Sequence, residues 1–118
     1  MTKMKAFVMK GIGSVGIMEK DIPMDPGPNE AVVRTTKALV CTSDVHTVGG
    51  GVGPRENMTL GHEAVGVVEK VGSEVRGFSK GDRVAVNAIT PDFICHNCQR
   101  GYPSQCEGML GDGNSPTR

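Results

Sequence analysis

Short apolar runs separated by glycine and proline occupy the first two thirds of the chain. Val, Ile, Ala and Leu dominate these runs, and apolar, β-branched runs bounded by turn residues are typical of strands rather than helices. Turn signals fall between the runs, at residues 11–13, 23–28, 72–73 and 77–82. The pattern therefore predicts strands near Lys5–Met9, Val15–Lys20, Glu30–Leu39, Glu63–Val71 and Arg83–Val86.

One segment, Thr42–Val48, lacks these breakers and is expected to form one or two helical turns. Thr42 or Ser43 is a suitable N-cap, and Asp44 falls in the first turn, where an acidic side chain is favourable. The three glycines at residues 49–51 are expected to end the helix.

The pattern changes after Val86. Between Thr90 and Gly113, cysteines, glycines and polar side chains replace the strand pattern. This segment has too little apolar surface to fold without a cross-link such as a bound metal. Residues 111–118 carry no helix or strand signal and are predicted to form an irregular tail.

Length and composition fit one domain with a modest aliphatic core, since the chain has 118 residues, 37% of them hydrophobic and 3% aromatic. Thirteen basic and thirteen acidic side chains leave no net charge. This balance argues against nucleic acid or an anionic membrane as a partner.

No run approaches the roughly 18 apolar residues that span a bilayer, and none near the N-terminus suits a secretory signal. We therefore expect a cytoplasmic protein whose four cysteines are metal ligands or free thiols rather than disulfides.

Residues 11–16 spell G-x-G-x-x-G, the pattern of dinucleotide-binding loops. That fingerprint needs a helix directly after the glycines and an acidic residue about 20 positions later. Pro23 follows too soon for such a helix. We therefore interpret the pattern as a hairpin turn.

The stronger metal-binding pattern is Asp92-x-x-Cys95-x-x-Cys98-x7-Cys106. Three thiolates and a carboxylate on a short loop can surround one ion tetrahedrally, and thiolates select zinc over magnesium or calcium. His96 could replace Asp92 as the fourth ligand, but it is adjacent to a ligand, so Asp92 is preferred. The alternative is a set of free or redox-active thiols, although the strand and helix of a thioredoxin-like dithiol are missing here.

A second candidate site is spread over two segments and consists of Cys41 and His62, with Ser43, Asp44, His46 and Glu63 close to them in sequence. A thiolate and an imidazole from separate segments are typical of an incompletely ligated catalytic zinc site. Taken singly, each residue has an ordinary alternative. A lone cysteine after an apolar run is usually a buried small hydrophobe, and a histidine at a strand start is usually a surface residue.

Four motifs occur in order along the chain: Cys41-x-Ser43-Asp44-x-His46, Gly61-His62-Glu63-Ala64-x-Gly66-x-Val68, Val71-Gly72-Ser73-x-Val75 and Gly81-Asp82-Arg83-Val84. With these motifs the chain resembles the N-terminal, GroES-like catalytic domain of zinc-dependent medium-chain alcohol dehydrogenases, from about Met4 to Leu110. Within that family it is most similar to the NADP-dependent secondary alcohol dehydrogenases.

The resemblance implies a mainly β fold, a GroES-like partly open barrel with short helical turns and a zinc-binding lobe at about residues 92–106. Residues 1–118 then form the catalytic domain. The implied reaction is reversible hydride transfer between a secondary or primary alcohol and NADP or NAD, with a ketone or aldehyde as the product. Homo-oligomers, tetramers or dimers, are typical of the family. Its Rossmann domain and the third protein ligand of its catalytic zinc are expected outside these 118 residues, which alone are expected to be inactive.

The resemblance also implies a role for each candidate residue. Cys41 and His62 hold the catalytic zinc, which acts as a Lewis acid. Glu63 approaches the metal or sets the local charge, and Asp44 orients His62 through the second ring nitrogen.

Proton transfer is implied for two further side chains. Ser43 accepts the proton of the alcohol and passes it toward His46, whose ordinary pKa near 6.5 suits a relay to solvent. Two alternatives stay open at this point: a zinc-free quinone reductase of the same superfamily, and a non-catalytic module stabilised by zinc. The secondary-alcohol subgroup generally lacks the structural-zinc cysteines, whereas this chain has three of them.

Overall fold

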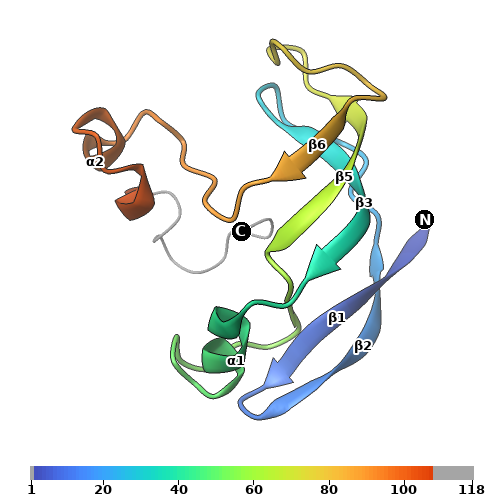
Figure 1. Ribbon diagram of the computed structural model, residues 1–118, viewed down its shortest axis with the longest axis vertical. Coiled ribbons are helices and arrows are strands. Elements are labelled where there is room, and N and C mark those ends of the chain that lie inside the picture. Colours follow the sequence, from blue (N-terminus) through green and yellow to red (C-terminus); the bar gives the residue numbers. More distant parts are fainter. Residues whose placement is uncertain (1, 108–118) are drawn as a thin grey trace. The chain divides into compact units, whose positions relative to one another are not determined.

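The computed structural model describes residues 2–107 of the chain (Figure 1). These residues form two compact units, one ending at Val86 and the other beginning at Asn87. The tail predicted for residues 111–118 lies outside the described residues. No helix between residues 2 and 107 is long and apolar enough to cross a membrane.

The first sheet of the first unit has the order β2-β1-β4 and is antiparallel. Its strands are β1 (Lys3–Gly11), β2 (Ser14–Asp21) and the two-residue β4 (Met58–Thr59). Ala6, Val8 and Met9 of β1 are buried and form most of the core of this unit.

The hairpin that joins β1 to β2 contains the G-x-G-x-x-G pattern. Gly11 pairs with Ser14 across the turn, and Gly13 has a φ of +75°, which favours glycine. A strand, not a helix, follows the glycines, so the interpretation of this pattern as a hairpin turn is confirmed.

The second sheet has the order β3-β5-β6 and is also antiparallel. Its strands are β3 (Ala31–Leu39), β5 (Glu63–Val71) and β6 (Arg83–Val86). Gly66 lies where β5 crosses β3 closely, because a Cβ atom there would stand only 2.4 Å from the carbonyl oxygen of Arg34. All five predicted strands are therefore present.

The predicted mainly β class is confirmed, but the strands form two separate sheets that are not closed into a barrel. An apolar groove of about 590 Å³ remains within the first unit. Side chains from both sheets line it, among them Met4, Phe7, Val33, Leu60 and Ala64.

Helix α1 (Thr42–Val48) has the predicted bounds, but its N-cap is Cys41 rather than Thr42 or Ser43. The backbone of Cys41 is extended, with φ −90° and ψ 161°, and its N–H donates to the Asp44 carboxylate at 2.9 Å. An acceptor side chain three residues after the cap stabilises the helix start in this way. The helix ends at the glycines, as predicted, with Gly49 as its C-cap.

The second unit contains two very short helices, α2 (His96–Gln99) and the 3-10 helix η1 (Pro103–Gln105). Cys106 is fully buried, whereas Phe93, Ile94 and Tyr102 are exposed. The described part of this unit therefore has almost no apolar core, as its composition predicted.

Candidate metal centres

Cys41, His62 and Glu63 form the first centre, although the sequence separates them. Leu39, the last residue of β3, pairs with Glu63, the first residue of β5. The antiparallel register therefore places the start of α1 beside the start of β5. One ligand atom from each of the three side chains lies within 4.8 Å of the other two.

Asp44 connects the two segments of the first centre. Its side chain is buried, and its Oδ2 accepts from the Cys41 N–H at 2.9 Å. The other oxygen, Oδ1, lies 3.2 Å from Nδ1 of His62. The predicted contact between Asp44 and His62 is therefore present, whereas the contact with the Cys41 backbone was not predicted. An acidic residue three positions after a cap was the sequence signal for it.

Without a metal, the surroundings of the first centre favour the thiolate form of Cys41 and the protonated form of His62. Hydrogen bonds to Ser43 lower the pKa of Cys41, although burial opposes this shift. Burial also opposes charge on His62, yet the neighbouring Cys41 and Asp44 raise the pKa of this ring. Sulfur, ring nitrogen and carboxylate oxygen are the donors that zinc takes in proteins. The residues present therefore fit a catalytic zinc ion.

The two residues predicted to move protons lie on the same helix. The Ser43 hydroxyl is 3.3 Å from Nε2 of His62. His46 is exposed, and its side chain makes no hydrogen bond to Ser43 in the described part of the chain.

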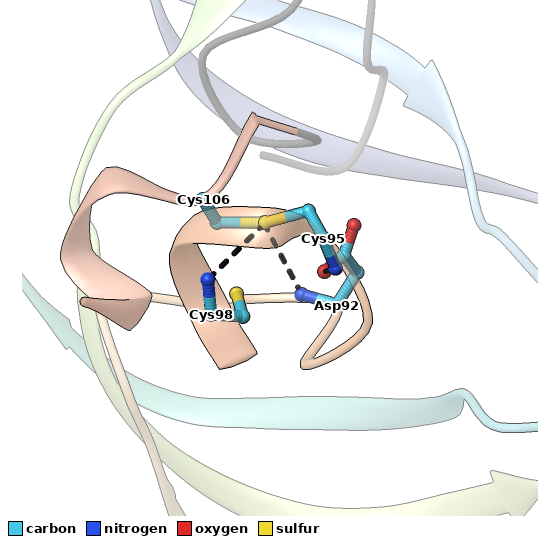
Figure 2. Close-up of side chains that lie close together, drawn as sticks. All are labelled: Asp92, Cys95, Cys98 and Cys106. Atoms are coloured by element: carbon cyan, nitrogen blue, oxygen red, sulfur yellow. Dashed lines mark hydrogen bonds between the residues drawn. The ribbon is translucent and has the colours of Figure 1, made fainter. Parts of the chain in front are cut away.

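Asp92, Cys95, Cys98 and Cys106 form the second centre, in the second unit (Figure 2). Cys95 caps α2, Cys98 lies on that helix, and Cys106 directly follows η1. The four ligand atoms lie within 4.8 Å of one another. His96 instead points its Nε2 at Arg100 Nη1, 3.3 Å away, so the cluster takes the donor that the sequence favoured.

Backbone amides hold the loop of the second centre in shape. Oδ1 of Asp92 accepts from the N–H of Ile94 at 2.9 Å and of Cys95 at 3.1 Å. The N–H of Asp92 donates to Sγ of Cys106, and that of Cys98 donates to Sγ of Cys95, both at 3.4 Å. Such contacts orient ligands and stabilise charge on sulfur. Sequence reasoning did not identify these amide donors.

These contacts set the charges of the second centre. Amide hydrogen bonds, first from Ile94 and then from Cys95, lower the pKa of Asp92 to about 2. The Cys98 amide lowers the pKa of Cys95, whereas burial and the neighbouring Cys95 raise the pKa of Cys98 to about 12. Coordination to zinc deprotonates a thiol outright, so this last shift does not oppose binding. Three sulfurs and a carboxylate fit a closed, structural zinc site.

Known proteins are similar to this chain in sequence. A family model for the alcohol dehydrogenase GroES-like domain matches residues 27–115. A probable NADP-dependent isopropanol dehydrogenase of Mycoplasma pneumoniae is 55% identical over 109 residues, 92% of this chain and 31% of that protein. The NADP-dependent isopropanol dehydrogenase of Thermoanaerobacter brockii is 56% identical over 108 residues, 91% of this chain and 30% of that protein.

A solved structure agrees with these sequence relatives. The zinc dependent alcohol dehydrogenase 2 from Streptococcus pneumonia aligns with a TM-score of 0.80 and 33% identity, over 90% of this chain and 30% of that one. The chain thus spans about 30% of the length of the relatives that it matches. The resemblance inferred from the motifs is confirmed: this chain belongs to the alcohol dehydrogenase GroES-like domain family.

Proposed function

We propose that this chain is the catalytic domain of a zinc-dependent alcohol dehydrogenase that transfers hydride reversibly between a small secondary alcohol and NADP. The observation that carries the proposal is the convergence of Cys41, His62 and Glu63 at one point of the first unit. The two isopropanol dehydrogenases described above are named as NADP-dependent, which supports the choice of alcohol and cofactor. The convergent donors favour this function over a zinc-free quinone reductase.

Zinc held by Cys41, His62 and Glu63 supplies Lewis-acid polarisation of the alcohol oxygen, which lowers the pKa of the alcohol. Asp44 occupies Nδ1 of His62 and would thereby leave Nε2 as the nitrogen that binds zinc. The same carboxylate holds the Cys41 backbone, so one buried group positions two of the ligands.

We assign Ser43 as the group that receives the proton of the alcohol, and the 3.3 Å between its hydroxyl and Nε2 of His62 supports this role. His46 is three residues further along α1, which puts it on the same helix face. Because His46 is exposed, it can pass the proton to solvent.

The second centre has a structural role in this proposal. Asp92, Cys95, Cys98 and Cys106 hold a second zinc ion, which replaces the apolar core that the unit lacks. The remaining features follow the family: a homo-oligomer in the cytoplasm, with alcohols and ketones as substrates and neither nucleic acid nor membrane as a partner. The balanced charge of the chain supports the last two statements.

The proposal can be tested by an activity assay. The full-length protein that contains this chain is loaded with zinc, and its turnover is measured with propan-2-ol and NADP. Ser43→Ala is expected to lower kcat by roughly 10²- to 10⁴-fold, the usual contribution of general acid–base catalysis, with unchanged zinc content. Thr42→Ala removes a neighbouring exposed hydroxyl and serves as the matched control. Equal kcat values for the Ser43→Ala variant and its control would contradict the assigned proton path.

A further inference from the structure

We propose that the second centre is an oxidation-sensitive metal switch, in which a disulfide between Cys95 and Cys106 expels the bound zinc. This inference rests on the structural zinc proposed above. The Sγ atoms of the two cysteines lie 4.0 Å apart. A disulfide needs about 2.05 Å, so the sulfurs must approach by about half of their separation.

The backbone around the two cysteines allows this approach. Cys95 has an extended backbone, with φ −70° and ψ 166°, and precedes α2. Cys106 has φ −54° and ψ 125° and follows η1. Both residues therefore lie outside regular helix, whereas Cys98 is held within α2. We therefore expect Cys95 and Cys106 to be the pair that forms the disulfide.

The ligand count makes disulfide formation incompatible with zinc binding. The thiolate, not the disulfide sulfur, is the form of cysteine that binds zinc. Once Cys95 and Cys106 are joined, only Cys98 and Asp92 are left as donors in the cluster. A site of four cysteines would keep two thiolates after the same reaction. Asp92 therefore makes this centre more sensitive to oxidation than a four-cysteine site.

The oxidant class is a hydroperoxide. Cys95 is half-buried and Cys106 is fully buried, so of these two residues peroxide reaches Cys95 first. The Cys95 thiolate attacks one peroxide oxygen, the O–O bond breaks, and the second oxygen leaves as hydroxide, which takes up a proton to form water. The Cys106 thiolate then attacks the Cys95 sulfenic acid, the S–O bond breaks, and this oxygen also leaves as water after protonation.

The electrons balance in this sequence. The two sulfurs together lose two electrons, and one hydrogen peroxide molecule takes up two protons and becomes two water molecules. Zinc has no redox chemistry and leaves as Zn²⁺. A dithiol such as dithiothreitol reverses the reaction by thiol–disulfide exchange.

Zinc release also changes the accessibility of Arg100. This exposed residue follows α2 and lies between the two cysteines that become joined. Without the ties from Cys98 and Asp92 to the metal, the segment around it opens to trypsin. Cleavage after Arg100 leaves two pieces that stay linked by the disulfide until a reductant is added.

The test uses the zinc-loaded Cys41→Ala variant, in which the first centre is disabled, treated with hydrogen peroxide. A chromogenic chelator counts the zinc released, and peptide mass spectrometry identifies the disulfide. We expect one zinc released for each disulfide formed, a link between Cys95 and Cys106, and zinc rebinding after dithiothreitol. Cleavage after Arg100 should rise by at least tenfold with oxidation. Asp92→Cys in the same background is the matched variant, and it should retain zinc at peroxide levels that empty its parent.

Each contrary result has a defined meaning. Zinc retained in the parent after the Cys95–Cys106 disulfide has formed, or a disulfide that joins Cys98 instead, would overturn the switch alone. A reduced Cys41→Ala variant that binds no zinc would overturn the structural zinc and the switch together. If Asp92→Cys does not fold, the disulfide map and the zinc count of its parent still decide the question.

Discussion

Replacing Asp44 with asparagine keeps the size of a buried side chain but removes one of its two acceptor oxygens. In the native chain one oxygen accepts from the Cys41 N–H at 2.9 Å and the other lies 3.2 Å from Nδ1 of His62. An amide oxygen can serve only one of these positions. If it serves Cys41, the NH₂ group donates to Nδ1 of His62, so the ring proton must move to Nε2. A protonated Nε2 cannot bind zinc.

The size of the loss in zinc affinity follows from the burial of Asp44. Loss of one partner of a buried polar group costs about 1–3 kcal/mol. At about 1.4 kcal/mol per factor of ten, this cost corresponds to roughly 5- to 150-fold in affinity. Removing the partner of a zinc-bound histidine typically weakens binding by about 10- to 100-fold, in the same range. We therefore expect Asp44→Asn to weaken zinc binding at the first centre by about 10- to 100-fold and to leave the second centre unchanged.

Competition with a chromophoric chelator measures the zinc affinity. Asp25→Asn is the matched control, because the Asp25 side chain is fully exposed. NMR titration of the metal-free chain gives a second readout. Burial opposes the charged ring, but Cys41 and Asp44 raise the pKa of His62, so Asp44→Asn should lower this pKa. Unchanged zinc affinity together with an unchanged His62 titration would refute the assigned role of Asp44.

Three further predictions concern the fold and the second centre. Gly66→Ala should lower the free energy of unfolding by about 1–3 kcal/mol in urea denaturation, because its Cβ would stand 2.4 Å from the Arg34 carbonyl oxygen. In the metal-free chain, hydrogen bonds to the Asp92 carboxylate should stabilise the loop fully at pH values above 3.8, the pKa of this group in the unfolded chain. This stability should be lost as the pH falls through about 2, the pKa of Asp92 in the folded chain, and amide NMR shifts can follow the loss. Cys98→Ser should release one zinc by metal analysis and expose the second unit to protease.

Matched variants separate these effects from general damage. Gly11→Ala should change stability by less than about 0.5 kcal/mol, since a Cβ there meets nothing within 4 Å. A loss as large as that of Gly66→Ala would show that crowding is not the cause. Asp92→Asn should abolish the acid transition near pH 2, and its persistence would assign the transition to another group. Cys41→Ala should keep the second zinc, and equal protease sensitivity of Cys98→Ser and the parent would contradict the structural role.

The five predicted strands and α1 were predictable because each has a local signal of its own. The strands carry apolar and β-branched runs between turn residues, and α1 lies between a capping sequence and three glycines. Strand β4 has no such signal, since two residues cannot show an alternating pattern. Its position is set by pairing with Val8 and Met9 of β1. The helices α2 and η1 are also short, with four and three residues, and carry no separate sequence signal.

The composition of the centres was predictable, but their geometry was not. The spacing of Asp92 and the three cysteines identified the second cluster, because all four donors lie within residues 92–106. The first centre depends on the register of β3 against β5, which pairs Leu39 with Glu63. No local pattern specifies that register. The predicted N-cap of α1, Thr42 or Ser43, was wrong. The side-chain acceptor is the Asp44 carboxylate, which binds the backbone N–H of Cys41 and so makes Cys41 the N-cap.

Stepwise removal of zinc by chelators of increasing strength is the sharpest test for two separate zinc centres in this chain. The first centre offers three donors, one of them an exposed carboxylate, whereas the second offers four. We expect two zinc ions per chain, one lost early and one late, with Cys41→Ala removing only the early ion and Cys98→Ser only the late one. Loss of both ions in a single step, or a late step that disappears with Cys41→Ala, would contradict this expectation.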